Sequence, residues 1–135
     1  MTDTARATIQ AYYDAFNAGD AAGMVACVTE DVEHRVNEGG IRRGAALFAA
    51  FCGHMGVSYR ETLTDMVIFT TPDGTRAAAE FTVQGTYLQT DPGLPPARGQ
   101  TYTLPAGAFF DLRDGRISRV TTFYNLADFI AQVSA

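Results

Sequence analysis

The chain is poor in the residues that mark several large classes of protein. Its 135 residues contain ten lysine and arginine residues against fifteen acidic ones, so the formal net charge is -5. Nucleic acids and anionic membranes are bound by clustered basic side chains, and here only Arg42 and Arg43 stand close together in a basic pair. The composition therefore predicts no nucleic-acid partner and no membrane partner.

Cysteines and long apolar runs are also scarce. Cys27 and Cys52 both lie in apolar helical patterns, which favours two buried free thiols over a disulfide. No apolar run approaches the roughly 20 residues that a membrane span needs, and no basic segment followed by an apolar one opens the sequence. These absences predict a cytoplasmic protein.

Motifs for metals, nucleotides and nucleophilic catalysis are missing. The two histidines, His34 and His54, are far apart in the sequence, and the cysteines do not have the spacing of metal ligands. The sequence contains no glycine-rich phosphate loop and no G-x-S-x-G motif. We therefore expect no metal and no cofactor.

What the chain does contain is typical of one globular domain. Hydrophobic residues make up 47% of it. A chain of this length buries roughly 68% of its unfolded surface, so one hydrophobic core is enough to hold it together. We expect a single domain over residues 1–135.

Apolar residues at helical spacing predict four helices, three in the first part of the chain and one at its end. The first begins at Thr2 or Asp3 and ends at Asn17-Ala18-Gly19, and a short second helix follows the capping residue Asp20. The second helix carries Met24, Val25 and Val28; a third runs from about Gly44 to His54, with Leu47, Phe48, Phe51 and Met55 on one stripe; a last one covers Leu126 to Val133.

Alternating apolar and polar residues predict five strands, one before the third helix and four between the third and the last. They lie near Val32–Asn37, Ser58–Thr71 and Thr75–Gln89, followed by two long strands on either side of a tight turn at Asp114-Gly115. Helices that cover one face of an antiparallel sheet make an α+β domain.

The strand Thr75–Gln89 indicates what each face of the sheet contacts. One set of alternating residues is apolar and should face the helices: Ala77, Ala79, Phe81, Val83 and Tyr87. The opposite face is polar but uncharged at Thr82, Gln84 and Thr86, which suits a second subunit better than water. We expect a homodimer through the sheet, which light scattering at micromolar concentration would test.

Several segments together resemble a known superfamily. They are IQAYYDAFNAGDAAGMVACVTEDV, an RRG before a helix, a GTY at a strand end, LPPARG in a loop, and FFDLRDGRI. The chain resembles the nuclear transport factor 2-like superfamily, and within it the SnoaL-like polyketide cyclases and ketosteroid-isomerase-related proteins. The resemblance implies a curved sheet wrapped by about three helices into a cone, with a pocket at its open end. It does not imply one activity, because this fold hosts isomerases, cyclases, hydrolases, dehydratases and non-enzymes.

The functional residues of these relatives are only partly present. Ketosteroid isomerases use an aspartate base opposite a tyrosine and a protonated aspartate. The resemblance places the tyrosine at Tyr12, but Val36 stands at the base position and Gly107 at the second aspartate. The aspartate that acts as acid and base in SnoaL-like cyclases corresponds to Asn125, whose amide does not titrate. Asn125 can still hydrogen-bond a carbonyl or an enol.

His34 is the remaining candidate base on the inner face of the first strand. An unperturbed histidine has a pKa near 6.5, and proton transfer by a well-placed group accelerates reactions by about 10² to 10⁴-fold. The alternative is a histidine that is hydrogen-bonded inside the core.

Two other candidates also have a purely structural explanation. Asn125 and Asp128 have the spacing of a capping box, so Asn125 is either a helix cap or a site residue, or both. Tyr12 either packs in the core or points its hydroxyl into the pocket. We expect Tyr87, Tyr102, Tyr124 and Phe51 to contact the ligand. Glu61 and Glu80 should point outward or lie at the dimer surface rather than act in catalysis.

These residues predict a pocket for an apolar, oxygenated small molecule. In the leading hypothesis the protein is a cofactor-free isomerase or cyclase. His34 would carry the proton, and Tyr12 and Asn125 would donate hydrogen bonds to a developing enolate. The alternative is a non-catalytic ligand-binding or dimerisation domain with a vestigial pocket.

Overall fold

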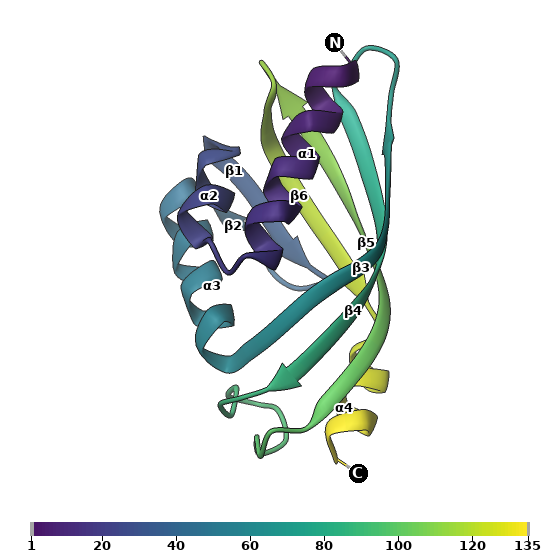
Figure 1. The fold of residues 1–135 in the computed structure, drawn as a ribbon. Coiled ribbons are helices and arrows are strands. Elements are labelled where there is room, and N and C mark those ends of the chain that lie inside the picture. The colour runs from purple at the N-terminus through teal and green to yellow at the C-terminus, as the bar shows by residue number, and fades with distance from the viewer. Residues whose placement is uncertain (1, 135) are drawn as a thin grey trace.

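A curved six-stranded sheet and four helices make up the computed structural model, which describes residues 2–134 (Figure 1). The elements are α1 (Thr2–Asn17), α2 (Ala21–Ala26), β1 (Val28–Val36), β2 (Arg42–Arg43), α3 (Ala45–Ser58), β3 (Tyr59–Thr70), β4 (Arg76–Tyr87), β5 (Thr101–Arg113), β6 (Arg116–Tyr124) and α4 (Leu126–Ser134). The sheet has the order β2-β1-β6-β5-β4-β3. This is the predicted α+β fold, with one short strand, β2, that the sequence pattern did not reveal.

The turn between α1 and α2 forms as its residues predict. Gly19 has a φ of 70°, the left-handed conformation that favours glycine after a helix. The Asp20 side chain accepts a hydrogen bond from the backbone N–H of Gly23 at 2.9 Å and so caps α2. The prediction that α2 includes Val28 is wrong. Val28 begins β1, where this β-branched side chain is buried and the residue pairs with Ile117.

Helix α3 differs from its prediction in length and in the stripe it buries. The helix continues past His54 to Ser58. Gly56 does not end it, because its φ is not left-handed, although a glycine inside a helix lowers helix stability. On the predicted stripe Phe48 is buried, but the Leu47 side chain is 53% exposed. Because α3 is apolar on all sides, its sequence does not indicate which face contacts the core.

The sheet is strongly curved because β3 contains a bulge. The pairing of β3 with β4 shifts register between Thr64 and Val67, and Asp65 has a φ of 56°. Just before the bulge, the side-chain amide of Asn17 donates to the backbone carbonyl of Leu63 at 3.1 Å and accepts from the backbone N–H of Leu63 at 2.8 Å. The end of α1 is thereby fixed to the strand that curves beneath it.

The last two strands are joined as the sequence predicts. Asp114 and Gly115 have φ values of 54° and 77°, the conformation of a two-residue hairpin turn. The other sheet pairs are antiparallel, except that β1 runs parallel to β6. A parallel neighbour is possible here because α3 and the whole meander separate β1 from β6 in the sequence.

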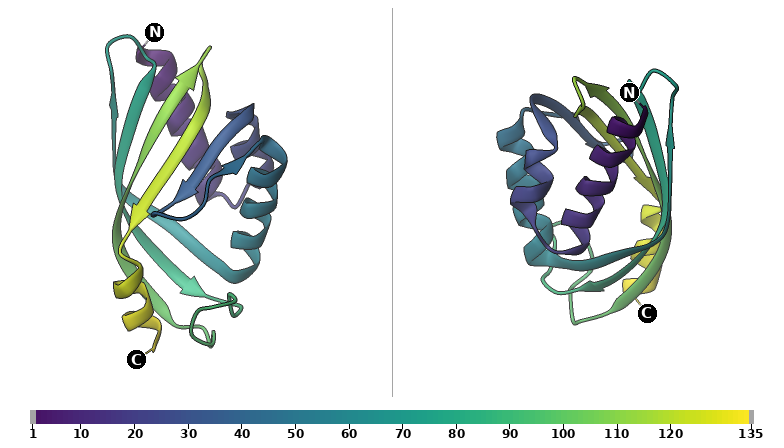
Figure 2. Two further views of the ribbon diagram at one scale, coloured as in Figure 1. Left: turned by 180° about the vertical axis from the view of Figure 1, so that it is seen from behind. Right: turned by 45° about the horizontal axis from the view of Figure 1, so that its top comes forward.

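The helices cover the concave face of the sheet and leave the convex face open (Figures 1 and 2). The alternating residues of β4 from Ala77 to Tyr87 that were expected to face the helices are buried. At the other end, α4 lies against β5 and places Phe129 on Tyr102, with ring centroids 4.9 Å apart. No helix within residues 2–134 has both the length and the apolar character that a membrane crossing requires.

Candidate functional site

A cavity of about 580 Å³ opens between the helices and the first half of β3. Its wall comes from the end of α1, from α2 and α3, and from Tyr59 to Thr62 of β3. Most of the side chains are apolar, including Phe16, Met24, Phe51, Met55 and Leu88. The volume and the apolar wall are those of a small-molecule site.

One acidic side chain, Glu61, stands on the inner wall of this cavity. Its neighbours across the sheet are Gly85 of β4 and then Tyr102 of β5. The Tyr102 hydroxyl donates a hydrogen bond to Oε2 of Glu61 at 2.5 Å. The second carboxylate oxygen, Oε1, has no hydrogen-bond partner within residues 2–134 and can therefore bond a ligand.

The strand between these two residues carries a glycine for a steric reason. A Cβ atom on Gly85 would lie 2.2 Å from Cζ and 2.4 Å from the hydroxyl oxygen of Tyr102. The tyrosine ring thus crosses β4 directly over the Gly85 backbone to reach Glu61. The residues Glu61, Gly85 and Tyr102 form one structural unit, which we call the Glu61 row.

Burial controls the protonation of Glu61. Desolvation raises the pKa of the carboxyl group, and the hydrogen bond from Tyr102 lowers it by less. The carboxyl group therefore keeps its proton to a higher pH than an exposed glutamate does. A carboxyl group with a raised pKa at a cavity wall is suited to general acid–base chemistry.

The prediction that Glu61 points outward is wrong. Tyr59, Glu61 and Leu63 share one parity along β3, and this is the face that turns toward the core. The charge of Glu61 suggested a position in solvent. Its neighbours on the same face of the strand, Tyr59 and Leu63, are apolar and could have indicated that this face points inward.

A second polar group lies beside the Glu61 row, near the start of the long loop between β4 and β5. The Tyr59 hydroxyl donates to Oδ2 of Asp91 at 2.6 Å, and Nε2 of His54 lies 3.0 Å from the other carboxylate oxygen. The backbone N–H of Asp91 donates to the Tyr87 hydroxyl, which itself donates to the carbonyl of Pro95. Asp91 thus holds the loop against α3 and β3. Nothing in the sequence pattern of the loop indicated this contact.

His34 lies deeper in the core than the cavity wall. Its side chain is almost fully buried, and its ring packs on Phe48 and Phe51 with centroids 5.2 and 4.5 Å away. Burial, helped by the nearby Arg42, lowers the pKa of His34 to about 4. Nδ1 has no hydrogen-bond partner within residues 2–134. His34 does not border the cavity itself, although Phe51 contacts both.

Tyr12 packs in the same part of the core. Its ring stacks on Phe48 and meets Tyr13 and Phe110 edge to face. Burial raises the pKa of its hydroxyl well above the ordinary value. The structure thus brings Tyr12 and His34 both into contact with Phe48, but does not bring them to Glu61.

The predicted ligand-contacting tyrosines surround the Glu61 row. Tyr102 belongs to it, and Tyr87 is fully buried with its ring stacked on Tyr59 at 5.4 Å. The charge of Glu61 contributes, after burial, to a raised pKa of the half-buried Tyr124. Of the predicted contact residues only Phe51 is itself part of the cavity wall.

Asn125 is the N-cap of α4. Its Oδ1 accepts a hydrogen bond from the backbone N–H of Asp128 at 3.1 Å, and its carbonyl accepts from Phe129. Asn125 is exposed and does not line the cavity. The capping role accounts for the residue without a ligand.

Replacing this cap is expected to weaken the protein by a small, defined amount. Asn125→Ala removes the bond to Asp128 and should lower the free energy of unfolding by about 1 kcal/mol. Asn125→Ser keeps a capping oxygen and should retain most of that stability. Denaturant unfolding of the two variants checks the prediction, and equal stability of Asn125→Ala and the wild type would contradict it.

Comparisons with known proteins identify the family of the chain. Residues 9–120 match the SnoaL-like domain model. Comparison with curated proteins returns no match. The match covers most of the chain, which therefore belongs to the SnoaL-like family.

Several solved structures have the same fold as this chain. A protein from a Silicibacter species, named as a candidate polyketide cyclase, is 69% identical; the alignment covers 97% of this chain and 96% of that one, with a TM-score of 0.95. A second such candidate, from Pseudomonas putida, is 54% identical over 98% of both chains, with a TM-score of 0.95. An NTF2-like protein of unknown function from Burkholderia pseudomallei is 20% identical over 98% of both chains, with a TM-score of 0.76, and shows the shared fold alone.

Proposed function

We propose that the protein is a cofactor-independent acid–base catalyst, an isomerase or a cyclase, for an apolar small molecule that carries a carbonyl or hydroxyl group. The ligand would occupy the cavity bounded by α1, α2, α3 and β3. The observation that carries the proposal is the Glu61 row, because it places a titratable group with a raised pKa on the wall of a largely apolar cavity.

The geometry assigns the proton to Glu61. In its protonated form the carboxyl group donates a hydrogen bond from Oε1 to a ligand oxygen and can pass the proton on as negative charge develops there. Tyr102 holds the other oxygen in place and stabilises the carboxylate that remains. Glu61 then takes a proton from another position of the ligand, which completes an isomerisation without a cofactor.

The charges near the cavity favour a neutral ligand. Glu61 and Asp20 are part of the wall, Asp91 is bonded to the wall residue Tyr59, and Arg60 is the basic residue of the wall within residues 2–134. An anionic ligand would lie close to these carboxylates. The relatives from Silicibacter and Pseudomonas putida are named as candidate polyketide cyclases, which supports a polyketide-like ligand.

The hypothesis drawn from the sequence assigns the proton to His34 instead of Glu61. The two assignments can be compared by position and by pKa. Glu61 borders the cavity and has a raised pKa, whereas His34 lies behind Phe51 with a pKa of about 4. A base with so low a pKa accepts protons poorly near neutral pH. The geometry therefore favours Glu61.

Glu61→Gln is the variant that tests the proposal. Glutamine keeps an oxygen for the Tyr102 hydroxyl but cannot exchange a proton. We expect turnover of a responsive hydrophobic ketone or lactone to fall by about 10² to 10⁴-fold, with ligand affinity changed only a few-fold. Thermal shifts with a panel of such compounds, followed by turnover measurements on those that bind, provide the readout.

The other outcomes of this experiment are equally informative. If turnover survives Glu61→Gln and is lost in His34→Phe, the proton carrier is His34. If ligands bind but the wild type converts none of them, the protein is the non-catalytic ligand-binding domain of the alternative hypothesis.

A further inference from the structure

Strands β1 and β2 place a histidine and an arginine side by side on the inner face of the sheet. His34 is directly opposite Arg42 in the antiparallel pairing, and Glu33 is opposite Arg43. Residues directly opposite each other on such strands point to the same face. Glu33 and Arg43 form an ion pair on the outer face, whereas His34 is buried on the inner face. Arg42 therefore faces inward beside His34.

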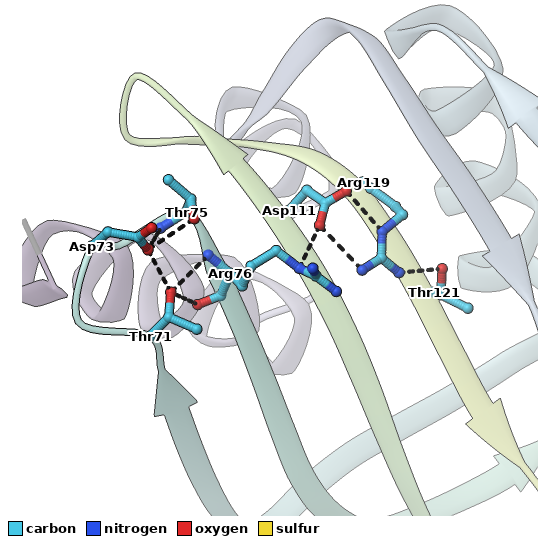
Figure 3. Close-up of polar contacts among 7 residues, drawn as sticks. All are labelled: Thr71, Asp73, Thr75, Arg76, Asp111, Arg119 and Thr121. Atoms are coloured by element: carbon cyan, nitrogen blue, oxygen red, sulfur yellow. Dashed lines mark hydrogen bonds and ion pairs between the residues drawn. The ribbon is translucent and has the colours of Figure 1, made fainter.

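These two inward side chains have no polar partner in the part of the chain that the structure describes. Neither ring nitrogen of His34 forms a hydrogen bond there, and Nδ1 is sealed from solvent. Arg42 likewise forms no ion pair and no hydrogen bond with residues 2–134. On the convex face, by contrast, Arg76 and Arg119 share the carboxylate of Asp111 at 2.8 and 3.0 Å (Figure 3). A buried donor without an acceptor is costly, and a bound ligand is one explanation for its presence.

The Phe51 ring separates this pair from the cavity. Its centroid lies 4.5 Å from the His34 ring centroid and 4.6 Å from the guanidinium carbon of Arg42. Phe51 is also part of the cavity wall. The ring face attracts the guanidinium group through a cation–π contact, which partly replaces the missing acceptor. A change of the Phe51 rotamer would connect both polar groups with the cavity.

The two side chains together present hydrogen-bond donors to an oxygen atom. Burial, and then the charge of Arg42, lower the pKa of His34 to about 4, so its ring is neutral at pH 7 and keeps one N–H donor. The guanidinium group adds several donors and its positive charge. Glu61 and Asp20 on the cavity wall disfavour a carboxylate on a ligand that spans the cavity. A neutral carbonyl oxygen fits both conditions.

We propose that Arg42 and His34 form a second polar subsite, which opens when the Phe51 ring turns aside and binds a carbonyl oxygen of the ligand. This inference rests on the proposed function, since the same ligand places its other oxygen at Glu61. The substrate class is then a neutral molecule with two separated oxygen atoms on an apolar body. In this role His34 is a hydrogen-bond donor and not the proton carrier.

Two ligands of nearly the same shape test the subsite. Both para-diacetylbenzene and para-ethylacetophenone carry one carbonyl group for Glu61, and only the first carries a second one. The wild type should bind the diketone about tenfold more tightly, because it gains a hydrogen bond from a charged donor. Arg42→Met keeps an apolar side chain but no donor, and should abolish this preference. Phe51→Ala should increase it, because no ring then has to move. NMR titration measures the affinities.

The control is Arg43→Met, which makes the same change at the neighbouring arginine on the outer face. It should retain the preference for the diketone. The nitrogen NMR signals of the His34 ring should shift with the diketone and not with para-ethylacetophenone. Equal affinity of the two ligands for the wild type, no binding of either, or an unchanged preference in Arg42→Met overturns the subsite. Tighter binding of para-acetylbenzoate than of the diketone overturns the neutral ligand class.

Glu61→Gln distinguishes a failure of this inference from a failure of the proposed function. The preference for the diketone is a property of binding at Arg42 and His34, so it should survive Glu61→Gln. If Arg42→Met abolishes the preference while turnover survives Glu61→Gln, the subsite stands and the role of Glu61 as proton carrier fails. If turnover is lost in Glu61→Gln while Arg42→Met keeps the preference, the proposed function stands and the subsite fails.

Discussion

Gly85→Ala is expected to destabilise the protein by about 1–3 kcal/mol and to separate Tyr102 from Glu61. Gly85 has no left-handed φ, so its backbone conformation suits alanine. In an ordinary strand, replacing such a glycine by alanine would stabilise the protein. The cost arises from one contact, because the new Cβ would lie 2.2 Å from the Tyr102 ring. The ring has little room to move, since Phe129 packs against it and Glu61 holds its hydroxyl.

A double-mutant cycle separates this contact from other effects of the substitution. In the Tyr102→Ala background the space above Gly85 is open, so adding Gly85→Ala should be neutral or stabilising. Gly53→Ala is the matched control, because Gly53 is an exposed glycine of α3 with nothing within 4 Å of its would-be Cβ. It should stabilise the protein by up to about 1 kcal/mol. A Gly85→Ala variant as stable as the wild type would show that Tyr102 does not cross β4 as described.

The substitution should also change the site. Without the Tyr102 hydroxyl, the carboxylate form of Glu61 loses the contact that lowers its pKa. Ligand binding in the cavity should weaken because the displaced ring moves toward the cavity wall. Tyr102→Phe removes the same hydroxyl and leaves the ring in place, so its comparison with Gly85→Ala distinguishes lost hydrogen bonding from blocked space.

Much of the fold could be predicted because its signals are local. Asp20 caps α2, Gly19 ends the turn before it, and Asp114-Gly115 closes the last hairpin, each through atoms within a few residues. The alternation from Ala77 to Tyr87 likewise identified the inner face of β4. Where a local signal was ambiguous, the prediction was wrong, as for Val28, which comes two residues after the end of α2 and pairs with Ile117.

The candidate site was predicted less well because it depends on register between distant strands. Glu61, Gly85 and Tyr102 meet only because β3, β4 and β5 pair with this alignment, which no single segment specifies. Asp91 comes from a loop rich in proline and glycine, and its bonds to Tyr59 and His54 depend on where that loop lies. The sequence pattern predicted Tyr102 as a site residue but did not predict its contact with Glu61.

His34 is expected to make the protein markedly less stable in acid. Burial lowers its pKa to about 4 in the folded protein, whereas the unfolded value is near 6.5. Between these values the unfolded chain binds more protons than the folded one, so the free energy of unfolding falls as the pH falls. The contribution is fully present above pH 6.5, and about 3 kcal/mol of it is lost by about pH 4.

Comparison with His34→Phe isolates this loss from the titration of the carboxylates. Phenylalanine preserves a ring between Phe48 and Phe51 but cannot take up a proton, and Arg42 then faces no imidazolium. The stability difference between the wild type and His34→Phe should shift by about 3 kcal/mol between pH 7 and pH 4 in denaturant unfolding. If the wild type and His34→Phe instead lose stability in parallel, His34 is not held neutral by burial, and its unpaired Nδ1 must have access to water or a ligand.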